Sequence, residues 1–211
     1  MPSKHAVDET LQSFDFQWGN LPTGDYLISD GRWRANVASY ILDELQLDAS
    51  QVQGKLVLDA GSGNGRWSYG FAQLGANVHG IDASQNGIDY ARQHVPTGAF
   101  QVCNLLDADR LRSLFPIRHF DTIFCWGVLH HTANPSAAFK NLVPFLKKDG
   151  VLHIFVYGKK SMRSHLFRKV YNSMSFDRRI TLAKLMSKYY KGNPHGNFDA
   201  YSPLIASEHT V

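Results

Sequence analysis

Short apolar runs alternate with amphipathic stretches along the first three quarters of the chain. Apolar runs bounded by glycine or polar residues are typical of buried strands, whereas apolar residues spaced three to four apart are typical of helices. The pattern predicts strands at 55–59, 77–82, 98–102, 120–126 and 151–157, and helices at 32–45, 65–74, 85–94, 108–115 and 135–146. Strands that alternate with helices in this way favour parallel pairing. We therefore expect an α/β fold with a doubly wound, mostly parallel, Rossmann-like sheet.

Two sequence signals refine the end of this pattern. Asn134 and Pro135 stand where a helix cap and a first helical residue are expected. Asp149 and Gly150 predict a turn into the last strand.

The pattern changes after Tyr157, where only helical periodicity remains. Apolar residues recur at every fourth position in two stretches: Met162, Leu166, Val170, Met174, and then Leu182, Met186, Tyr190. Such stripes predict amphipathic helices that pack on a core. We therefore divide the chain into a core at 1–158, which begins with an N-terminal helical segment containing Phe14, Phe16 and Trp18, and a helical extension at 159–211.

Composition favours a soluble enzyme domain. Hydrophobic residues make up 44% of the 211 positions, and no apolar run approaches the length of about 18 residues that spans a membrane. The polar N-terminus lacks the apolar segment of a signal peptide. Cys103 and Cys125 lie in or beside predicted strands and are expected to be reduced core thiols. The ten histidines show no zinc-binding spacing. We expect a cytoplasmic protein without a metal.

Charge is distributed unevenly. Residues 147–191 hold 12 Lys and Arg against 2 Asp and Glu, whereas residues 1–146 hold 10 against 14. A basic segment could attract an anionic substrate, nucleic acid or a phospholipid surface. It could equally be the solvated side of helices, and both interpretations stay open.

The glycine-rich stretch at 57–67, VLDAGSGNGRW, carries the first chemical signal. Asp59 ends a strand, and three glycines at alternate positions turn the chain into a helix. In an open α/β sheet a ligand binds at this position. Asp82 ends the next strand, where a carboxylate can accept both hydroxyls of a ribose. A nucleoside-containing cofactor is the hypothesis that follows, although Asp82 could instead cap the next helix, with Ser84 as the other candidate cap.

The turn itself distinguishes between cofactor classes. A dinucleotide fingerprint needs a small residue where Arg66 stands, and a phosphate-binding loop needs a Gly-Lys-Ser/Thr sequence that is absent here. The stretch DAGSGNG instead resembles motif I of the class I S-adenosylmethionine (SAM) dependent methyltransferases. The resemblance continues through VHGIDAS at 78–84, FDTIFCWGVLHHT at 120–132 and LKKDGVLHIFVYG at 146–158. These four collinear motifs cover about half the chain.

The resemblance implies a cofactor site for SAM and its product S-adenosyl-L-homocysteine (SAH). Asp59 and the glycine turn, Gly61, Ser62 and Gly63, would face the methionine end of the cofactor. Asp82 would bind the ribose, with Ala83 beside the adenine. The acid that usually accepts the adenine amino group is replaced by Asn104, followed by Leu105, with Asp107 as the rival position. Trp126 would lie beside the sulfonium, or it is core packing. Arg66 would bind the methionine carboxylate or pair with a nearby acid.

The chemistry implied is methyl transfer to a small-molecule acceptor by in-line displacement, in which alignment supplies most of the catalysis. His130 and His131 are the candidate general bases; either could instead only shape the following turn. The residues after Cys125 lack the Asn/Asp-Pro-Pro-aromatic motif of methyltransferases acting on the exocyclic amines of DNA bases, which argues against DNA as a partner. WGVLHHT resembles the quinone-biosynthesis and small-molecule branch. The basic segment makes an anionic acceptor a further possibility.

Two other functions remain as alternatives. One is a SAM-binding protein without turnover, because Asn104 replaces an acid and the family's closing antiparallel strands are not found in the sequence. We therefore also consider that the chain is a fragment, or that a homodimer covers the exposed edge of the sheet. The other is a nicotinamide-dependent Rossmann oxidoreductase, which would normally need a Tyr-x-x-x-Lys pair; serines follow Tyr157 and Tyr171 at that spacing.

Overall fold

The computed structural model describes residues 2–21, 28, 30–116, 119–158 and 162–189. Its centre is a five-stranded sheet with the order β3-β2-β1-β4-β5, in which every pairing is parallel. The strands are β1 (Leu56–Ala60), β2 (Asn77–Asp82), β3 (Ala99–Val102), β4 (Phe120–Trp126) and β5 (Leu146–Phe155). Strand order reverses between β1 and β4, which places a crevice at the carboxyl ends of these two strands. The predicted α/β sheet is confirmed.

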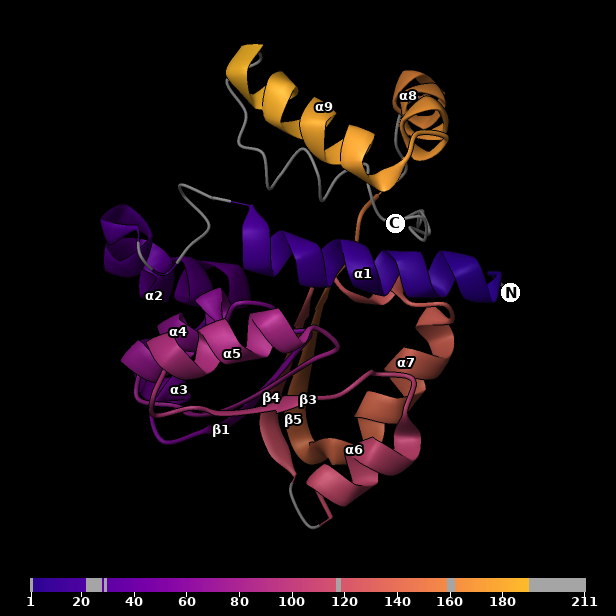
Figure 1. Cartoon of the computed structure of the whole chain (residues 1–211). Coiled ribbons are helices and arrows are strands. Elements are labelled where there is room, and N and C mark those ends of the chain that lie inside the picture. Colours follow the sequence, from indigo (N-terminus) through magenta and orange to yellow (C-terminus); the bar gives the residue numbers. More distant parts are fainter. Residues whose placement is uncertain (1, 22–27, 29, 117–118, 159–161, 190–211) are drawn as a thin grey trace.

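Helices cover both faces of the sheet (Figure 1). One face carries α2 (Gly31–Leu45), α3 (Ala49–Val52), α4 (Arg66–Gln73) and α5 (Gln85–His94). The other carries α6 (Ala108–Leu114) and α7 (Pro135–Leu142). Short 3-10 turns, η1 (Leu129–His131) and η2 (Val143–Phe145), flank α7.

Side chains alternate along each strand and thereby build two cores. In β1, Val57 packs toward α2 and α4, whereas Leu58 and Ala60 pack toward α6 and α7. In β4, Phe124 packs in the core on the side of α2 and α4, and Cys125 packs in the core on the side of α6 and α7. This is the two-residue period of a strand buried on both faces. The two cysteines are free thiols buried in the second core, as their sequence positions predicted.

The region around β5 departs from the sequence prediction. The predicted helix at 135–146 ends at Leu142 and continues only as the 3-10 turn η2; Pro144 has no amide hydrogen to donate, so the α-helix stops there. The strand begins at Leu146, before the predicted turn at Asp149 and Gly150. Its pairing with β4 shifts register between Leu146 and Val151. The predicted turn therefore lies within β5 as an irregularity of the strand.

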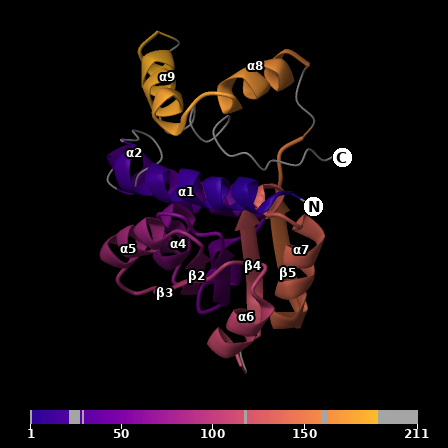
Figure 2. The same ribbon diagram turned by 45° about the vertical axis from the view of Figure 1, so that its right-hand side comes forward.

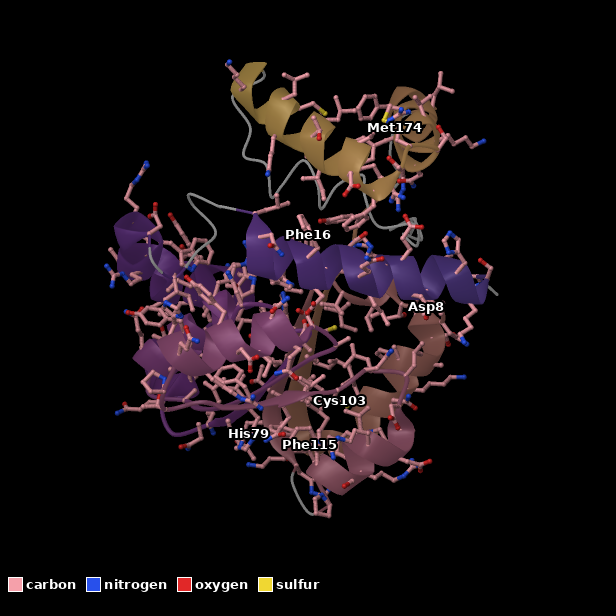
Figure 3. All side chains as sticks on the ribbon, viewed as in Figure 1. Asp8, Phe16, His79, Cys103, Phe115 and Met174 are labelled. Carbon is pink, nitrogen blue, oxygen red and sulfur yellow. The ribbon has the colours of Figure 1, made fainter. Side chains whose placement is uncertain are left out.

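Helix α1 (Lys4–Asn20) lies across the sheet at the ends of the strands, between the sheet and the C-terminal helices α8 (Met162–Asn172) and α9 (Phe176–Tyr189) (Figures 1 and 2). Phe16 of α1 meets Phe176 of α9 edge to face, with ring centroids 5.4 Å apart. Figure 3 shows Phe16 on the side of α1 that faces α9, and Met174 where α8 and α9 meet. The N-terminal helical segment and the amphipathic extension therefore pack on each other.

The predicted role of the α8 stripe is wrong in part. Leu166 and Val170 are 66% and 51% exposed, so they do not pack on a core in the described chain. Tyr171 and Ala183 are buried instead. Tyr190 lies outside the described residues, as does the rest of the predicted extension beyond residue 189. Among the described residues, no helix is both long and apolar enough to cross a membrane.

Candidate functional site

A cavity of about 410 Å³ opens at the carboxyl ends of the strands. Every strand contributes lining residues at or just after its end: Gly61 after β1, Asp82–Ser84 at β2, Cys103–Leu106 after β3, Trp126–Val128 at β4, and Tyr157 after β5. Helix α1 lines the remaining side. The cavity therefore occupies the crevice that the reversal of strand order predicts.

The glycine turn needs its glycines for two physical reasons. Gly61 and Gly63 have φ angles of +89° and +51°, a region that side chains disfavour. A Cβ at Gly61 would also lie 2.1 Å from Cγ2 of Val128, and one at Gly63 would lie 2.5 Å from the Trp18 ring. The backbone therefore approaches the loop after β4 and helix α1 more closely than another residue would allow.

Asp82 borders the cavity and is fixed by two backbone amides. Its carboxylate accepts hydrogen bonds from Gly63 N at 2.9 Å and from Ser84 N at 2.8 Å. Ser84, not Asp82, caps α5, because its hydroxyl accepts from Gly87 N at 2.9 Å. Burial raises the pKa of Asp82, these two amides oppose the rise, and the charge of Asp15 adds to it. The acid is thus held in place at the cavity wall.

Asp59, near the end of β1, does not contribute to the cavity lining. It is 1% exposed, and the Ser68 hydroxyl donates a hydrogen bond to it at 2.6 Å. Burial raises the pKa of Asp59 to about 7, against the opposing effect of the Ser68 bond. Ser62 and Gly63 are also absent from the cavity lining. Of the four residues Asp59, Gly61, Ser62 and Gly63 predicted to face the methionine end, Gly61 borders the cavity.

Asn104 and Leu105 both line the cavity, as does Ala83. The Asn104 side-chain oxygen accepts from Leu106 N at 2.9 Å, so part of its acceptor capacity holds the loop after β3. Asp107, the rival position, caps α6 by accepting from Arg110 N at 2.9 Å and does not line the cavity. The geometry therefore favours Asn104 as the residue that meets a ligand.

Trp126 contacts both the cavity and a cluster of aromatic rings. It borders the cavity and stacks on Phe155 with ring centroids 4.2 Å apart and an interplanar angle of 8°. Arg66 also borders the cavity, with its guanidinium 5.5 Å from the Trp33 ring centroid and 5.2 Å from that of Trp67. Cation–π contacts of this kind stabilise a guanidinium beside an aromatic surface.

The two candidate bases have different surroundings. His130 is fully buried, with its ring 4.1 Å from that of Tyr157, and does not line the cavity. His131 does line it, and its ring meets Phe14 of α1 edge to face at 4.9 Å. The structure therefore places only one of the two predicted histidines, His131, at the cavity wall.

Sequence reasoning missed the part of the site that α1 supplies. The cavity is lined from α1 by Val7, Thr10, Leu11, Phe14 and Trp18. These positions share one helical face, because they recur at intervals of three and four residues. The sequence shows this spacing, but it does not indicate that this face of the helix contacts the glycine turn.

Within the described residues, no group of three His, Cys, Asp or Glu side chains is arranged to hold a metal ion. The cavity instead combines one acid, one guanidinium and many apolar or aromatic walls. Such a site is suited to a small organic ligand with a hydroxylated or cationic part.

Comparison with known proteins gives this cavity a family context. Residues 58–154 match the family described as "Methyltransferase domain". The chain is 34% identical over 115 residues to a protein of Actinobacillus pleuropneumoniae named "Ubiquinone biosynthesis O-methyltransferase", and the match covers 53% of this chain and 49% of that protein. A protein of the same name from Glaesserella parasuis is 36% identical over 105 residues, or 48% and 44% of the two chains. The chain thus spans about half the length of the curated relatives it matches.

Solved structures support the fold. A SAM-dependent methyltransferase from Anabaena variabilis superposes with a TM-score of 0.63 at 16% identity, covering 99% of this chain and 78% of that one. A structure described as the DhpI-SAM-HEP complex superposes with a TM-score of 0.55 at 20% identity, covering 81% and 73%. At these identities the likeness concerns the arrangement of the chain.

Proposed function

Because residues 58–154 form a methyltransferase domain of the class I, SAM-dependent family, we propose that this chain binds SAM in the cavity and transfers its methyl group to a small-molecule acceptor. The observation that carries the proposal is the convergence of the glycine turn, Asp82 and Asn104 on one cavity at the point where strand order reverses.

The residues present fit the cofactor. The turn at Gly61 borders the cavity and packs closely on Val128, and a carboxylate borders the cavity at Asp82, held by two amides. A volume of about 410 Å³ lies in the range typical of small-ligand sites. When bound, SAM supplies a methyl group on a positively charged sulfur, which becomes a neutral leaving group.

Each polar residue then has a binding role. The Asp82 carboxylate accepts the ribose hydroxyls, and Asn104 accepts the adenine amino group. Asp59, whose burial favours its neutral form, becomes ionised beside the ammonium of the methionine end, with Ser62 and Gly63 supporting the turn. Trp126 presents an aromatic ring to the sulfonium. Ala83 and Leu105 border the adenine.

His131 is the proposed general base. For a hydroxyl acceptor, one of its ring nitrogens takes the acceptor proton as the oxygen forms its bond to the methyl carbon and the carbon–sulfur bond breaks. An imidazole suits this task because its ordinary pKa lies near neutrality. His130, buried behind His131, packs against Tyr157 and holds the wall in place.

The acceptor we propose is apolar and carries a hydroxyl group on an aromatic ring. The cavity wall near His131 is built from Phe14 and Tyr157. The two curated relatives are named as O-methyltransferases of ubiquinone biosynthesis, which supports a hydroxyl acceptor. The wall gives less support to the anionic acceptor considered from charge alone, because Arg66 is the one Lys or Arg among the described lining residues.

Calorimetric titration with SAH, using NADH as the control ligand, tests the cofactor assignment. We expect binding of SAH and not of NADH. Asp82→Ala should weaken SAH binding at least tenfold, as expected for losing a charged acceptor worth about 1.5–3 kcal/mol. Asp89→Ala removes an exposed acid from the neighbouring α5 and should leave the affinity unchanged.

Turnover separates an enzyme from a SAM-binding protein without activity. Transfer of labelled methyl from SAM to members of a panel of phenols and catechols supports the enzyme, and His131→Ala should then lower the rate at least a hundredfold, in line with the loss of a general base. Binding of SAH without transfer to any acceptor would favour the non-catalytic alternative. Binding of NADH in place of SAH would overturn the assignment in favour of an oxidoreductase.

A further inference from the structure

Helix α1 is joined to the cofactor side of the cavity by a specific set of hydrogen bonds. Asp15 accepts from the Ser84 hydroxyl at 2.7 Å, from Asn86 N at 3.1 Å and from Asn86 Nδ2 at 2.9 Å. Asn86 Nδ2 also approaches the Asp15 carbonyl oxygen at 3.2 Å. All of these contacts are made to the start of α5, directly after Asp82. A single acid on α1 thus connects the helix to the loop that carries the proposed ribose-binding residue.

Ser84 stands between the two acids. Its backbone N–H donates to Asp82, while its hydroxyl donates to Asp15 and accepts from Gly87 N. A displacement of Asp15 would therefore change the hydrogen bonding of the residue that orients Asp82. Asp15 does not line the cavity itself, so any effect on the cofactor is transmitted through Ser84 and Asn86.

Glycines bring α1 unusually close to the site. A Cβ at Gly19 would lie 2.9 Å from Asn86 Nδ2, and one at Gly87 would lie 3.3 Å from the Trp18 ring. The same indole lies against Gly63 of the glycine turn. The helix can occupy this position because three neighbouring residues lack side chains.

The position of α1 matters because the helix forms a wall of the cavity along its length, from Val7 to Trp18. A ligand enclosed by that wall dissociates more slowly when α1 is held in place, because motion of the helix would break its contacts with the ligand. The Asp15 contacts fasten the wall at its C-terminal part, where Trp18 covers the glycine turn.

We propose that Asp15 is a positioning residue for the cofactor: it fastens α1 over the cavity through Ser84 and Asn86 and thereby slows cofactor release. The proposal rests on the proposed function, because it assumes that the cavity holds SAM or SAH. It adds an element, α1, and a residue, Asp15, that the family motifs at 57–67 and 78–84 do not contain.

The experiment measures SAH affinity and the SAH dissociation rate on the full chain. Asp15→Ala removes all the side-chain acceptors and should raise the dissociation constant about tenfold, the scale of a charged hydrogen bond. Most of this change should appear in the dissociation rate, because the wall holds bound ligand and does not attract it. Asp15→Asn keeps an acceptor for Ser84 and should remain within about threefold of the unmodified chain.

Asp8→Ala is the matched control. Asp8 is exposed on the same helix, seven residues earlier, and so has nearly the same helical phase and the same charge (Figure 3). Its substitution should leave both quantities unchanged. Asn86→Ala removes only the Nδ2 contacts to Asp15 and keeps the bonds from Ser84 and from the backbone N–H of residue 86, so it should give a smaller loss than Asp15→Ala. The double variant should be no weaker than Asp15→Ala, because the Nδ2 contact to the Asp15 side chain is already absent there.

The outcomes separate the two proposals. Failure of the unmodified chain to bind SAH would overturn both the proposed function and the role of Asp15. Binding of SAH with equal affinities and dissociation rates for Asp15→Ala and Asp8→Ala would overturn the role of Asp15 alone. An equal loss in Asp15→Ala and Asp15→Asn would also overturn it, because a fastening contact should be rescued by the remaining acceptor.

Discussion

At the scale of single residues, burial decides the chemistry of the site. Asp59 has an ordinary pKa of 3.8, and burial raises it to about 7. Between these values the folded protein binds a proton that the unfolded chain releases. The contribution of Asp59 to stability is therefore complete at low pH and is lost as the pH rises through about 7.

Cofactor binding should have the opposite pH dependence. If the ammonium of SAH needs the ionised Asp59, we expect affinity to rise by roughly tenfold for each pH unit below 7 and to level off above it. Calorimetric titrations of the unmodified chain and Asp59→Asn from pH 5.5 to 8 measure this effect. Since Asp82 also has a raised pKa, the difference between the two profiles isolates Asp59. Superimposable slopes would contradict the assignment.

Asn104 offers a second test at this scale. Asn104→Asp keeps an oxygen for Leu106 N and adds the charge that the family usually has at this position. A charged acceptor bonds an amino group more strongly by about 1 kcal/mol, so SAH binding should tighten several-fold. Isothermal titration measures the change, with Asp107→Asn as the control, because Asp107 is committed to capping α6. Weaker binding in the control, with no gain in Asn104→Asp, would show that Asp107 is the adenine acceptor.

At the scale of elements, the local pattern predicted most of the core. The ranges 77–82, 85–94 and 120–126 coincide with β2, α5 and β4, because their apolar periods and flanking turn residues are local signals. The cap at Asn134 is also confirmed, since its side chain accepts from Ala137 N at 3.0 Å. The end of α7 was missed although Pro144 marks it.

Only part of the site could be predicted from the sequence, because the rest depends on tertiary packing. Asp82, Asn104 and Trp126 could be placed at the cavity because they follow strands whose ends meet at one edge of a parallel sheet. Phe14 and Trp18 could not be placed there, since the amphipathic pattern of a helix does not identify the surface on which the helix packs. His130 and His131 are adjacent in the sequence, and only their packing in the folded chain shows that His131 lines the cavity and His130 does not.

The contact between α1 and α9 is the element-scale feature with the clearest consequence. Arg179 is 3% exposed, forms an ion pair with Glu9 of α1, and donates to the Met174 carbonyl at 3.1 Å. Without Arg179, Glu9 keeps its contact to the exposed His5 at 3.1 Å but loses its buried partner. Breaking a buried ion pair costs about 3–5 kcal/mol. We expect Arg179→Ala to detach α8 and α9 from α1.

Limited proteolysis and urea unfolding measure this effect. In Arg179→Ala the region from residue 162 onward should be cut well before the sheet domain, and the unfolding midpoint should fall. Arg178→Ala removes a neighbouring exposed arginine and should behave like the unmodified chain. Identical cleavage patterns for the two variants would show that the ion pair does not hold the extension.

At the scale of the whole molecule, α1 is shared between two parts. One of its faces lines the cavity, and Glu9 and Phe16 contact α9. Figure 2 shows α1 between the sheet and the helices α8 and α9. The proposed division at residue 158 therefore separates two sequence regions that are joined through the N-terminal helix. A homodimer that covers the outer edge of β5 stays a prediction; in the described sheet, that strand has a paired neighbour on one side only.

This shared helix predicts that the cofactor stabilises the extension without touching it. SAH at a hundred times its dissociation constant should stabilise the folded chain by about 2.7 kcal/mol and raise its melting temperature by several degrees. Hydrogen exchange should slow not only around Gly61 and Asp82 but also in α1 and α9, because an α1 held by ligand gives α9 a fixed surface. In Arg179→Ala the slowing should persist in the glycine turn and disappear from α9. Protection of α9 that survives the loss of Arg179 would mean that the extension senses the cofactor by another route, and protection confined to the turn in the unmodified chain would mean that α1 does not transmit binding at all.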